Sequence, residues 1–264
     1  MRSRTDRSLV SALGRISFLC IAMMACPPSM ISSGRTFSPI VCRDELSPLR
    51  RQELASKLRT ITGWSDLAFD EFGALRVGSK PAVGGSPSAR ELLRQALSSK
   101  NVIVLEDASN RPDVIFCRVI PGRWINNKHG DVPAYVVLID FADFDHLMGD
   151  KAALKAFDVG WGFLHELDHV INDSTDPQSL SESGECEEHI NLMRRECNLP
   201  LRTDYFFTFF PHAANSDFKT RFVRLAFKQD DAGSAKHRRY WIIWDATLVG
   251  LPAPTEIAER KFSL

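Results

Sequence analysis

Residues 163–171 read FLHELDHVI and contain the pattern H-E-x-x-H, in which His165 and His169 stand four positions apart. Residues at this spacing lie on one face of an α-helix, so a helix here would bring both imidazoles to one metal ion. Glu166 lies next to His165 and can contact a water molecule bound to that ion without being a ligand itself. The spacing therefore predicts a helix that carries a metal site, with Zn²⁺ as the ion.

Apolar residues around the motif recur at helical spacing, which predicts a long and largely buried helix. Imidazole and carboxylate groups are costly to bury unless they are paired or bind a metal. The alternative is a chance pattern on a surface helix, which this apolar setting disfavours. The residues at helical spacing are Leu154, Phe157, Trp161, Leu164, Asp168 and Ile171.

The composition is that of an ordinary globular protein. The chain has 264 residues, of which 44% are hydrophobic, and its 33 basic and 33 acidic residues give a formal net charge of zero. This length suits one sizeable domain or two small ones. Because no basic patch stands out from this balance, nucleic acid is not an expected partner.

The N-terminus predicts export. Arginines within residues 2–15 precede an apolar run over residues 16–25, which is too short to span a bilayer comfortably and ends at Cys26-Pro27-Pro28. We therefore expect a signal peptide over residues 1–26, a linker over 27–45 and one domain over 46–264. The expected location is the periplasm, the cell envelope or the medium.

Residues 23–26 resemble the cleavage box of a bacterial lipoprotein, in which Cys26 would become the lipidated first residue. The box departs from that pattern because Met23 stands where a Leu is usual. A lipid on Cys26 is the only membrane attachment that the sequence suggests.

The cysteines of the expected domain match no zinc-finger spacing. In an exported protein they would face an oxidising compartment. Cys186 and Cys197 are expected on one helix and too far apart to bridge each other. The other pairings stay open among Cys42, Cys117, Cys186 and Cys197.

Several elements are expected before the motif. Ser47-Pro48 and Ser86-Pro87 each combine a helix cap with a Pro at the first helical position, which predicts helices over about 47–60 and 86–99. The first of these should have Leu49, Leu54, Leu58 and Ile61 on its apolar side, and a hairpin or a pair of short strands is expected around Gly73.

Strands are expected over 102–105, 114–120 and 134–139, where β-branched and aromatic residues lie between turn signals. The run 134–139 is the last strand before the motif. It is either a sheet edge that takes up an extended peptide beside the metal or an ordinary core strand.

A second helix is expected after the motif, over about 183–197, with Cys186, Ile190, Met193 and Cys197 along its apolar side. A catalytic zinc site needs a third protein ligand and a position for water. Helical periodicity leaves Glu187 and His189 in competition for that role and turns Glu188 toward solvent.

At this point residues 165–202, under a fifth of the chain, resemble the gluzincin branch of zinc metallopeptidases, to which thermolysin belongs. That pattern is H-E-x-x-H followed by a helix with Glu-x-x-x-Asp or Glu-x-x-x-Asn, and Glu187 with Asn191 fits it. The resemblance implies that Glu187 is the third ligand and that Asn191 orients a ligand histidine. The metzincin continuation is absent, since Asn172 and Thr175 stand where its Gly and third His would be.

The remaining segments, 205–210, 218–228 and 239–244, are expected to be strands. Tyr205 or His212 could supply the hydrogen-bond donor that stabilises an oxyanion. The expected fold is therefore α+β: a zincin-like metallopeptidase core with a mixed β-sheet, the motif helix, a second ligand-bearing helix and C-terminal strands.

The resemblance implies an exported zinc metallopeptidase, a hydrolase that binds one Zn²⁺ through His165, His169 and Glu187 and acts on peptide or protein substrates. Glu166 would be its general base. Two alternatives stay open: a non-catalytic envelope protein in which the metal only braces the core, and a secreted peptidase-type effector.

Overall fold

The computed structural model describes residues 38–109, 111–122, 125–127, 130–179, 182–210, 220–230 and 237–249. The chain divides into two compact units, Met1–Thr36 and Phe37–Leu264, and all described residues belong to the second. The expected signal peptide and Cys26 lie outside the described residues. No helix among the described residues has both the length and the apolar character needed to cross a membrane.

The main sheet is mixed and has the strand order β1-β4-β8-β5. Strands β1 (Ile40–Cys42), β4 (Val102–Asp107) and β8 (Ala134–Ile139) are parallel, and β5 (Cys117–Pro121) runs antiparallel to β8. The sequence predicted a linker over residues 27–45. Strand β1 lies within this range, so its three residues belong to the folded sheet and not to a linker. With the helices, this sheet makes the described unit α+β, as predicted.

The strand at the sheet edge near the motif is β5. The 134–139 run, β8, lies between β4 and β5, which makes it a core strand rather than an edge. Just before β5, Phe116 has a φ of 64°. Its N–H donates to Asp143 Oδ2 and its carbonyl accepts from the N–H of Asp140, and these bonds hold the turn that leads into the edge strand.

Local capping explains where the first helices begin. The side chain of Ser47 accepts a hydrogen bond from Arg50 N at the start of α1 (Pro48–Thr62). Ser86 does the same for Ala89 N at the start of α2 (Pro87–Ser98). Of the residues expected on the apolar side of α1, Leu54, Leu58 and Ile61 are buried, whereas Leu49 is 71% exposed.

The motif helix is shorter than predicted. Instead of one continuous helix there are two, α4 (Lys151–Ala156) and α5 (Val159–Asn172). Phe157 leaves the helical conformation, and the carboxylate of Asp158 then caps α5 by accepting from Gly160 N and Trp161 N. Apolar spacing alone did not reveal this break, because apolar residues continue through both helices, although α4 buries Ala153 and Ala156 in the aromatic core and α5 buries its apolar residues in the larger one.

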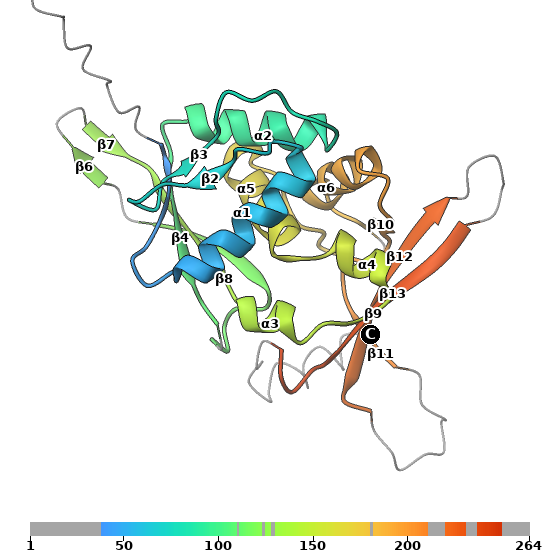
Figure 1. Ribbon diagram of the computed structural model, residues 1–264. Helices are drawn as coiled ribbons and strands as arrows, with labels where there is room; N and C mark the ends of the chain where they lie inside the picture. Colours follow the sequence, from blue (N-terminus) through green and yellow to red (C-terminus); the bar gives the residue numbers. More distant parts are fainter. Residues whose placement is uncertain are drawn as a thin grey trace, which may run out of the picture. The chain divides into compact units, whose positions relative to one another are not determined.

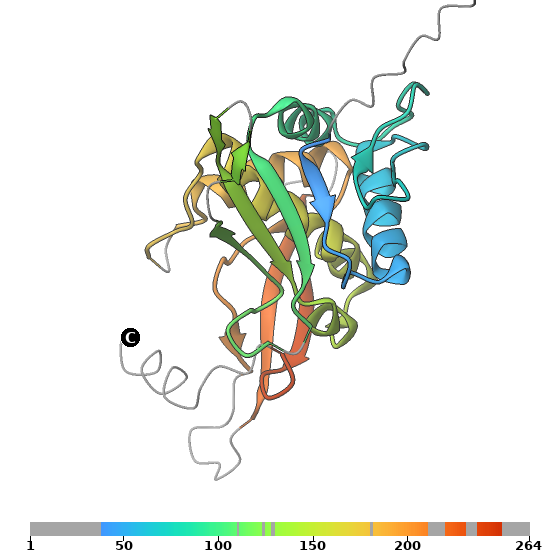
Figure 2. The same ribbon diagram turned by 90° about the vertical axis from the view of Figure 1, so that its left-hand side faces the viewer.

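Helix α6 (Glu185–Glu196) follows, and it packs with α1 and α2 around α5 on one face of the main sheet (Figures 1 and 2). The large core between these helices and the sheet includes Ile103, Leu105, Trp161 and Phe163. The motif helix is therefore the central helix of this layer.

A second, antiparallel sheet is built on the long hairpin of β12 (Phe222–Asp230) and β13 (His237–Asp245). It packs on a separate core rich in aromatic residues, in which Phe116 contacts Phe157 and Trp244 edge to face. The shorter elements are β2 (Ala68–Phe69), β3 (Leu75–Arg76), β6 (Ile125–Asn127), β7 (Gly130–Val132), α3 (Phe141–Asp145), β9 (Met148–Gly149), β10 (Leu201–Arg202) and β11 (Thr208–Phe209).

Candidate metal centre

Helix α5 brings the two motif histidines together. Their rings lie edge to face with centroids 4.8 Å apart. His165 Nε2 is 3.1 Å and His169 Nε2 is 3.5 Å from the same atom, Asp176 Oδ1. Two imidazole nitrogens and one carboxylate oxygen therefore converge on one point.

The loop after α5 supplies that carboxylate. Asp173 ends the helix in the left-handed conformation, with a φ of 55°, and Asp is one of the few residues apart from Gly that adopts it readily. The chain then turns back and places Ser174 and Asp176 beside the motif. His169 Nδ1 lies 2.7 Å from the Ser174 carbonyl, so its N–H donates there and Nε2 is left to bind a cation.

The other nitrogen of His165 faces helix α6. Nδ1 lies 3.3 Å from Cys186 Sγ and 3.7 Å from Glu187 Oε2. Burial raises the pKa of the Cys186 thiol far above its ordinary value, and nearby carboxylates including Asp168 and Asp176 raise it further. The thiol is therefore neutral, and it packs against His165 with a contact to the His165 carbonyl at 3.3 Å.

His165, His169, Asp176 and Cys186 form a candidate metal-binding group, in which one ligand atom from each residue lies within 4.8 Å of the others. The electrostatics agree with a site for a cation. Burial lowers the pKa of His169, but its hydrogen bonds to Asp176 and Ser174 outweigh this and raise the pKa to about 9. Burial raises the pKa of Asp176, but the two imidazoles bring it well below the usual range. The Asp176 carboxylate is therefore suited to attract positive charge to this point.

Glu166 projects from α5 toward the edge strand. Its Oε2 accepts a hydrogen bond of 2.8 Å from the N–H of Val119 in β5. Burial raises the pKa of Glu166 above its ordinary value, although His165 and His169 act in the opposite direction. A carboxylate with a raised pKa next to two imidazoles is suited to accept a proton.

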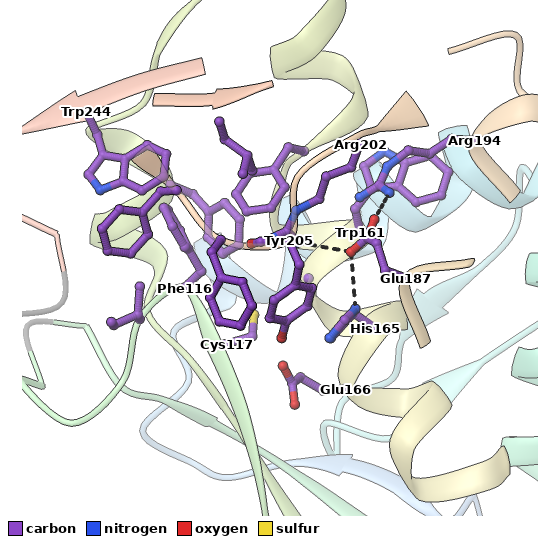
Figure 3. A pocket seen from close by; sticks show the side chains of 17 residues that line it. Phe116, Cys117, Trp161, His165, Glu166, Glu187, Arg194, Arg202, Tyr205 and Trp244 are labelled. Atoms are coloured by element: carbon purple, nitrogen blue, oxygen red, sulfur yellow. Dashed lines mark hydrogen bonds and ion pairs between the residues drawn. The ribbon is translucent and has the colours of Figure 1, made fainter. Parts of the chain in front are cut away.

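Glu187 is fully buried and held by two arginines. Its Oε1 accepts from Arg194 on the same helix, and its Oε2 accepts from Arg202 of β10 at 3.0 Å (Figure 3). Burial raises the pKa of Glu187, but the two arginines outweigh this effect and hold the pKa below its usual value. Glu187 therefore reaches His165, but both of its oxygens are already engaged.

Asn191 and His189 lie away from the histidine nitrogens that meet Asp176. The Asn191 amide contacts Arg202 N and O at 2.9 Å each, as well as Arg194. It thus orients the arginines around Glu187 instead of a motif histidine. His189 Nδ1 lies 2.9 Å from Asp168 Oδ2.

Tyr205 lies over the site and His212 lies outside the described residues. The Tyr205 ring is 6.1 Å from that of His165, and its hydroxyl donates to Asp176. Burial raises the pKa of Tyr205, as do Asp176 and Glu166, so the phenol stays protonated. Tyr205 and Glu166 point into the same space beside His165 (Figure 3).

A cavity of about 220 Å³ opens next to these groups. His165 and Glu166 line one end, and the rest of the wall combines aromatic side chains such as Phe116 and Trp244 with the ion pairs of Glu187 (Figure 3). Cys117 also lines it; Cys42, Cys117, Cys186 and Cys197 are all free thiols.

Comparisons of the chain with protein-family models, with curated proteins and with solved structures find no match. Sequence reasoning missed Asp176, although a signal was present. In the metzincin pattern a Gly at position 172 would end the helix and a His at position 175 would be the third ligand. Here Asp173 ends the helix and Asp176 supplies the carboxylate, so each stands one residue later than in that pattern.

Proposed function

We propose that this protein is a zinc-dependent peptidase in which His165, His169 and Asp176 hold the ion and Glu166 is the general base. The observation that carries the proposal is the convergence of His165 Nε2 and His169 Nε2 on Asp176 Oδ1 beside a buried carboxylate. Zn²⁺ favours such nitrogen and oxygen ligands and, at catalytic sites, three protein ligands with a position left for water.

Asp176 replaces Glu187 as the third ligand in this proposal. Asp176 contacts both motif nitrogens, whereas Glu187 faces only the Nδ1 side of His165 and is neutralised by Arg194 and Arg202. Cys186 Sγ, like Glu187, lies on the Nδ1 side of His165, at 3.3 Å from that nitrogen, whereas Asp176 meets the Nε2 atoms of both histidines. This leaves the fourth position to water.

The bound ion would polarise the scissile carbonyl and lower the pKa of its water toward ~7. Glu166, which is buried beside both imidazoles, would take the proton from this water and pass it to the leaving amine. Tyr205 carries a phenol that stays protonated beside the site and donates to Asp176; turned from Asp176, the same O–H would donate to the developing oxyanion.

The edge strand β5 is suited to bind an extended peptide. Gly122 N donates to Ala134 O, and Asp140 N donates to Phe116 O, so residues 116, 118, 120 and 122 bond to β8. The alternation of an antiparallel pair then turns the backbone groups of Cys117 and Val119 outward. The N–H of Cys117 already donates to the Ile115 carbonyl and that of Val119 to Glu166, so a peptide would pair through the carbonyls of these two residues. A peptide added here would run past Glu166 and place an apolar side chain in the aromatic cavity.

The zincin-like identity of the fold and export from the cytoplasm belong to the same proposal. They are supported by an antiparallel edge strand beside the motif helix and by the N-terminal arginines before an apolar run. The substrate would then be a peptide or protein outside the cytoplasm.

The test is Glu166→Gln, with Glu188→Gln on the exposed side of α6 as the matched control. Glu166→Gln should retain Zn²⁺ but lower the rate of hydrolysis of an unstructured peptide by about 10²-fold or more, because the amide accepts no proton. The control should hydrolyse at the wild-type rate. Wild-type hydrolysis by Glu166→Gln would overturn the mechanism, and loss of zinc would make Glu166 a ligand.

A structural metal site is the second candidate, and the position of Cys186 within the ligand group favours it. In that case Cys186 would be the fourth ligand and no water position would remain. Cys186→Ser would then weaken zinc binding strongly, and the wild-type protein would hydrolyse no peptide. The peptidase proposal expects Cys186→Ser to retain the metal.

A further inference from the structure

A second polar cluster lies behind the metal centre, on the side of α5 that faces α6. Its centre is Asp168, whose side chain is fully buried. This carboxylate is 2.6 Å from Asn172 Nδ2, 2.6 Å from Ser174 Oγ and 2.9 Å from His189 Nδ1. A buried carboxylate is costly unless such donors surround it, so the cluster has a strongly preferred arrangement.

Ser174 joins this cluster to the metal centre. Its hydroxyl donates to Asp168, while its backbone carbonyl accepts from His169 Nδ1. It also stands two residues before Asp176 in the loop that leaves α5. Moving Ser174 would therefore disturb both the orientation of one imidazole and the place of the carboxylate opposite it.

His189 is the member of the cluster that comes from another helix. Asp168, Asn172 and Ser174 belong to α5 and the loop after it, whereas His189 belongs to α6. Its Nδ1 lies near Asp168 Oδ2 and also 3.4 Å from Ser174 Oγ. Its side chain is 40% exposed, so replacing it does not open a large buried cavity.

We propose that His189 is a positioning residue for the metal centre: through Asp168 and Ser174 it orients His169 and holds the loop that carries Asp176. This inference rests on the proposed metal site. Helical periodicity allowed His189 to be the third metal ligand, and this inference gives it a positioning role instead. Groups that orient metal ligands in this way typically contribute about 10- to 100-fold in affinity.

The experiment measures the dissociation constant of Zn²⁺ by competition with a chelator, together with the melting temperature of the metal-free protein. His189→Ala should weaken zinc binding about 10-fold or more. His189→Asn should restore most of the affinity, because its amide nitrogen can take the place of Nδ1. The control is His237→Ala on the exposed start of β13, which should bind zinc as the wild type does.

A double-mutant cycle separates positioning from a general loss of stability. Ser174→Ala removes the hydroxyl but keeps the carbonyl, and His189→Ala should cost little further affinity in that background. The visible spectrum of bound Co²⁺ should also change in His189→Ala, because it reports the geometry of the ligands.

The outcomes distinguish this inference from the function on which it rests. If wild-type protein binds zinc and His189→Ala binds it equally well, the positioning role is overturned and the peptidase proposal stands. If His189→Ala lowers zinc affinity by the same factor in the wild-type protein and in Ser174→Ala, the role of His189 through Ser174 is also overturned. If wild-type protein binds no zinc, both proposals fall.

Discussion

At the scale of single residues, two carboxyl groups near the motif histidines have opposite environments. Glu166 is buried, and burial raises its pKa, whereas the partly exposed Asp176 faces two imidazoles that hold its pKa well below the usual range. Groups whose pKa values are pushed apart in this way commonly divide the work of a catalytic site. Here Asp176 is suited to bind a cation and Glu166 to move a proton.

Replacing Asp176 tests the ligand assignment. Asp176→Ala should weaken Zn²⁺ binding by about 10²-fold or more, because it removes one of the three protein ligands and the only carboxylate among them. The measurement is chelator competition on purified protein, and the exposed Asp44→Ala is the control. If Asp176→Ala keeps its zinc while Glu187→Ala loses it, the third ligand is Glu187 and the gluzincin pattern holds.

At the scale of elements, helices α2 and α6 are joined by hydrogen bonds between the Glu196 carboxylate of α6 and the N-terminus of α2. Glu196 at the end of α6 accepts hydrogen bonds from Ser88 N at 3.1 Å and Ser88 Oγ at 2.8 Å, and from the Ser86 hydroxyl. Negative charge is favourable at the N-terminus of a helix. Partial burial raises the pKa of Glu196, but the bonds from Ser86 and Ser88 outweigh it, so the pKa lies below its ordinary value.

This lowered pKa predicts how stability depends on pH. The stabilisation is present above the unfolded-state pKa of about 4.3 and is lost as pH falls through the lower folded-state pKa. Glu196→Gln should therefore reduce the free energy of unfolding at pH 7 by about 0.5–1 kcal/mol, since the site is exposed and screened. In urea unfolding the difference from wild type should shrink steadily as pH falls below 5. Glu91→Gln on the exposed face of α2 is the control, and a difference independent of pH would contradict the prediction.

At the scale of the whole described unit, a buried ion network lies between the two cores. Arg194 pairs with Glu187, donates from Nε to the Ala156 carbonyl at 2.7 Å, and lies over the rings of Trp161 and Phe227. Trp161 belongs to the larger core and Phe227 to the aromatic one. The network therefore joins the helical layer to the C-terminal sheet.

Removing one partner of such a network leaves buried charge without compensation. Glu187→Ala should lower the free energy of unfolding by about 3–5 kcal/mol, measured by denaturant on metal-free protein. Glu188→Ala, the exposed neighbour, should change it by less than about 0.5 kcal/mol. A stable Glu187→Ala protein that has lost only its zinc would contradict the structural role and favour a ligand role instead.

Local chemistry in the sequence was enough to predict several parts of the fold. Ser47 and Ser86 before prolines predicted the starts of α1 and α2, and the spacing of His165 and His169 predicted a helix with both imidazoles on one face. These features depend on residues within one helical turn, so the sequence contains them directly.

Tertiary structure decided which groups meet across elements. Periodicity placed Glu187 at the border of the apolar face of α6, but its partner Arg202 comes from β10, and this contact engages the carboxylate that the sequence analysis assigned to the metal. The edge strand likewise depends on pairing between segments distant along the chain. Asp176 became the carboxylate opposite the histidines because Asp173 turns the backbone at the end of α5, and the direction of a loop follows from backbone conformation and packing rather than from residue spacing.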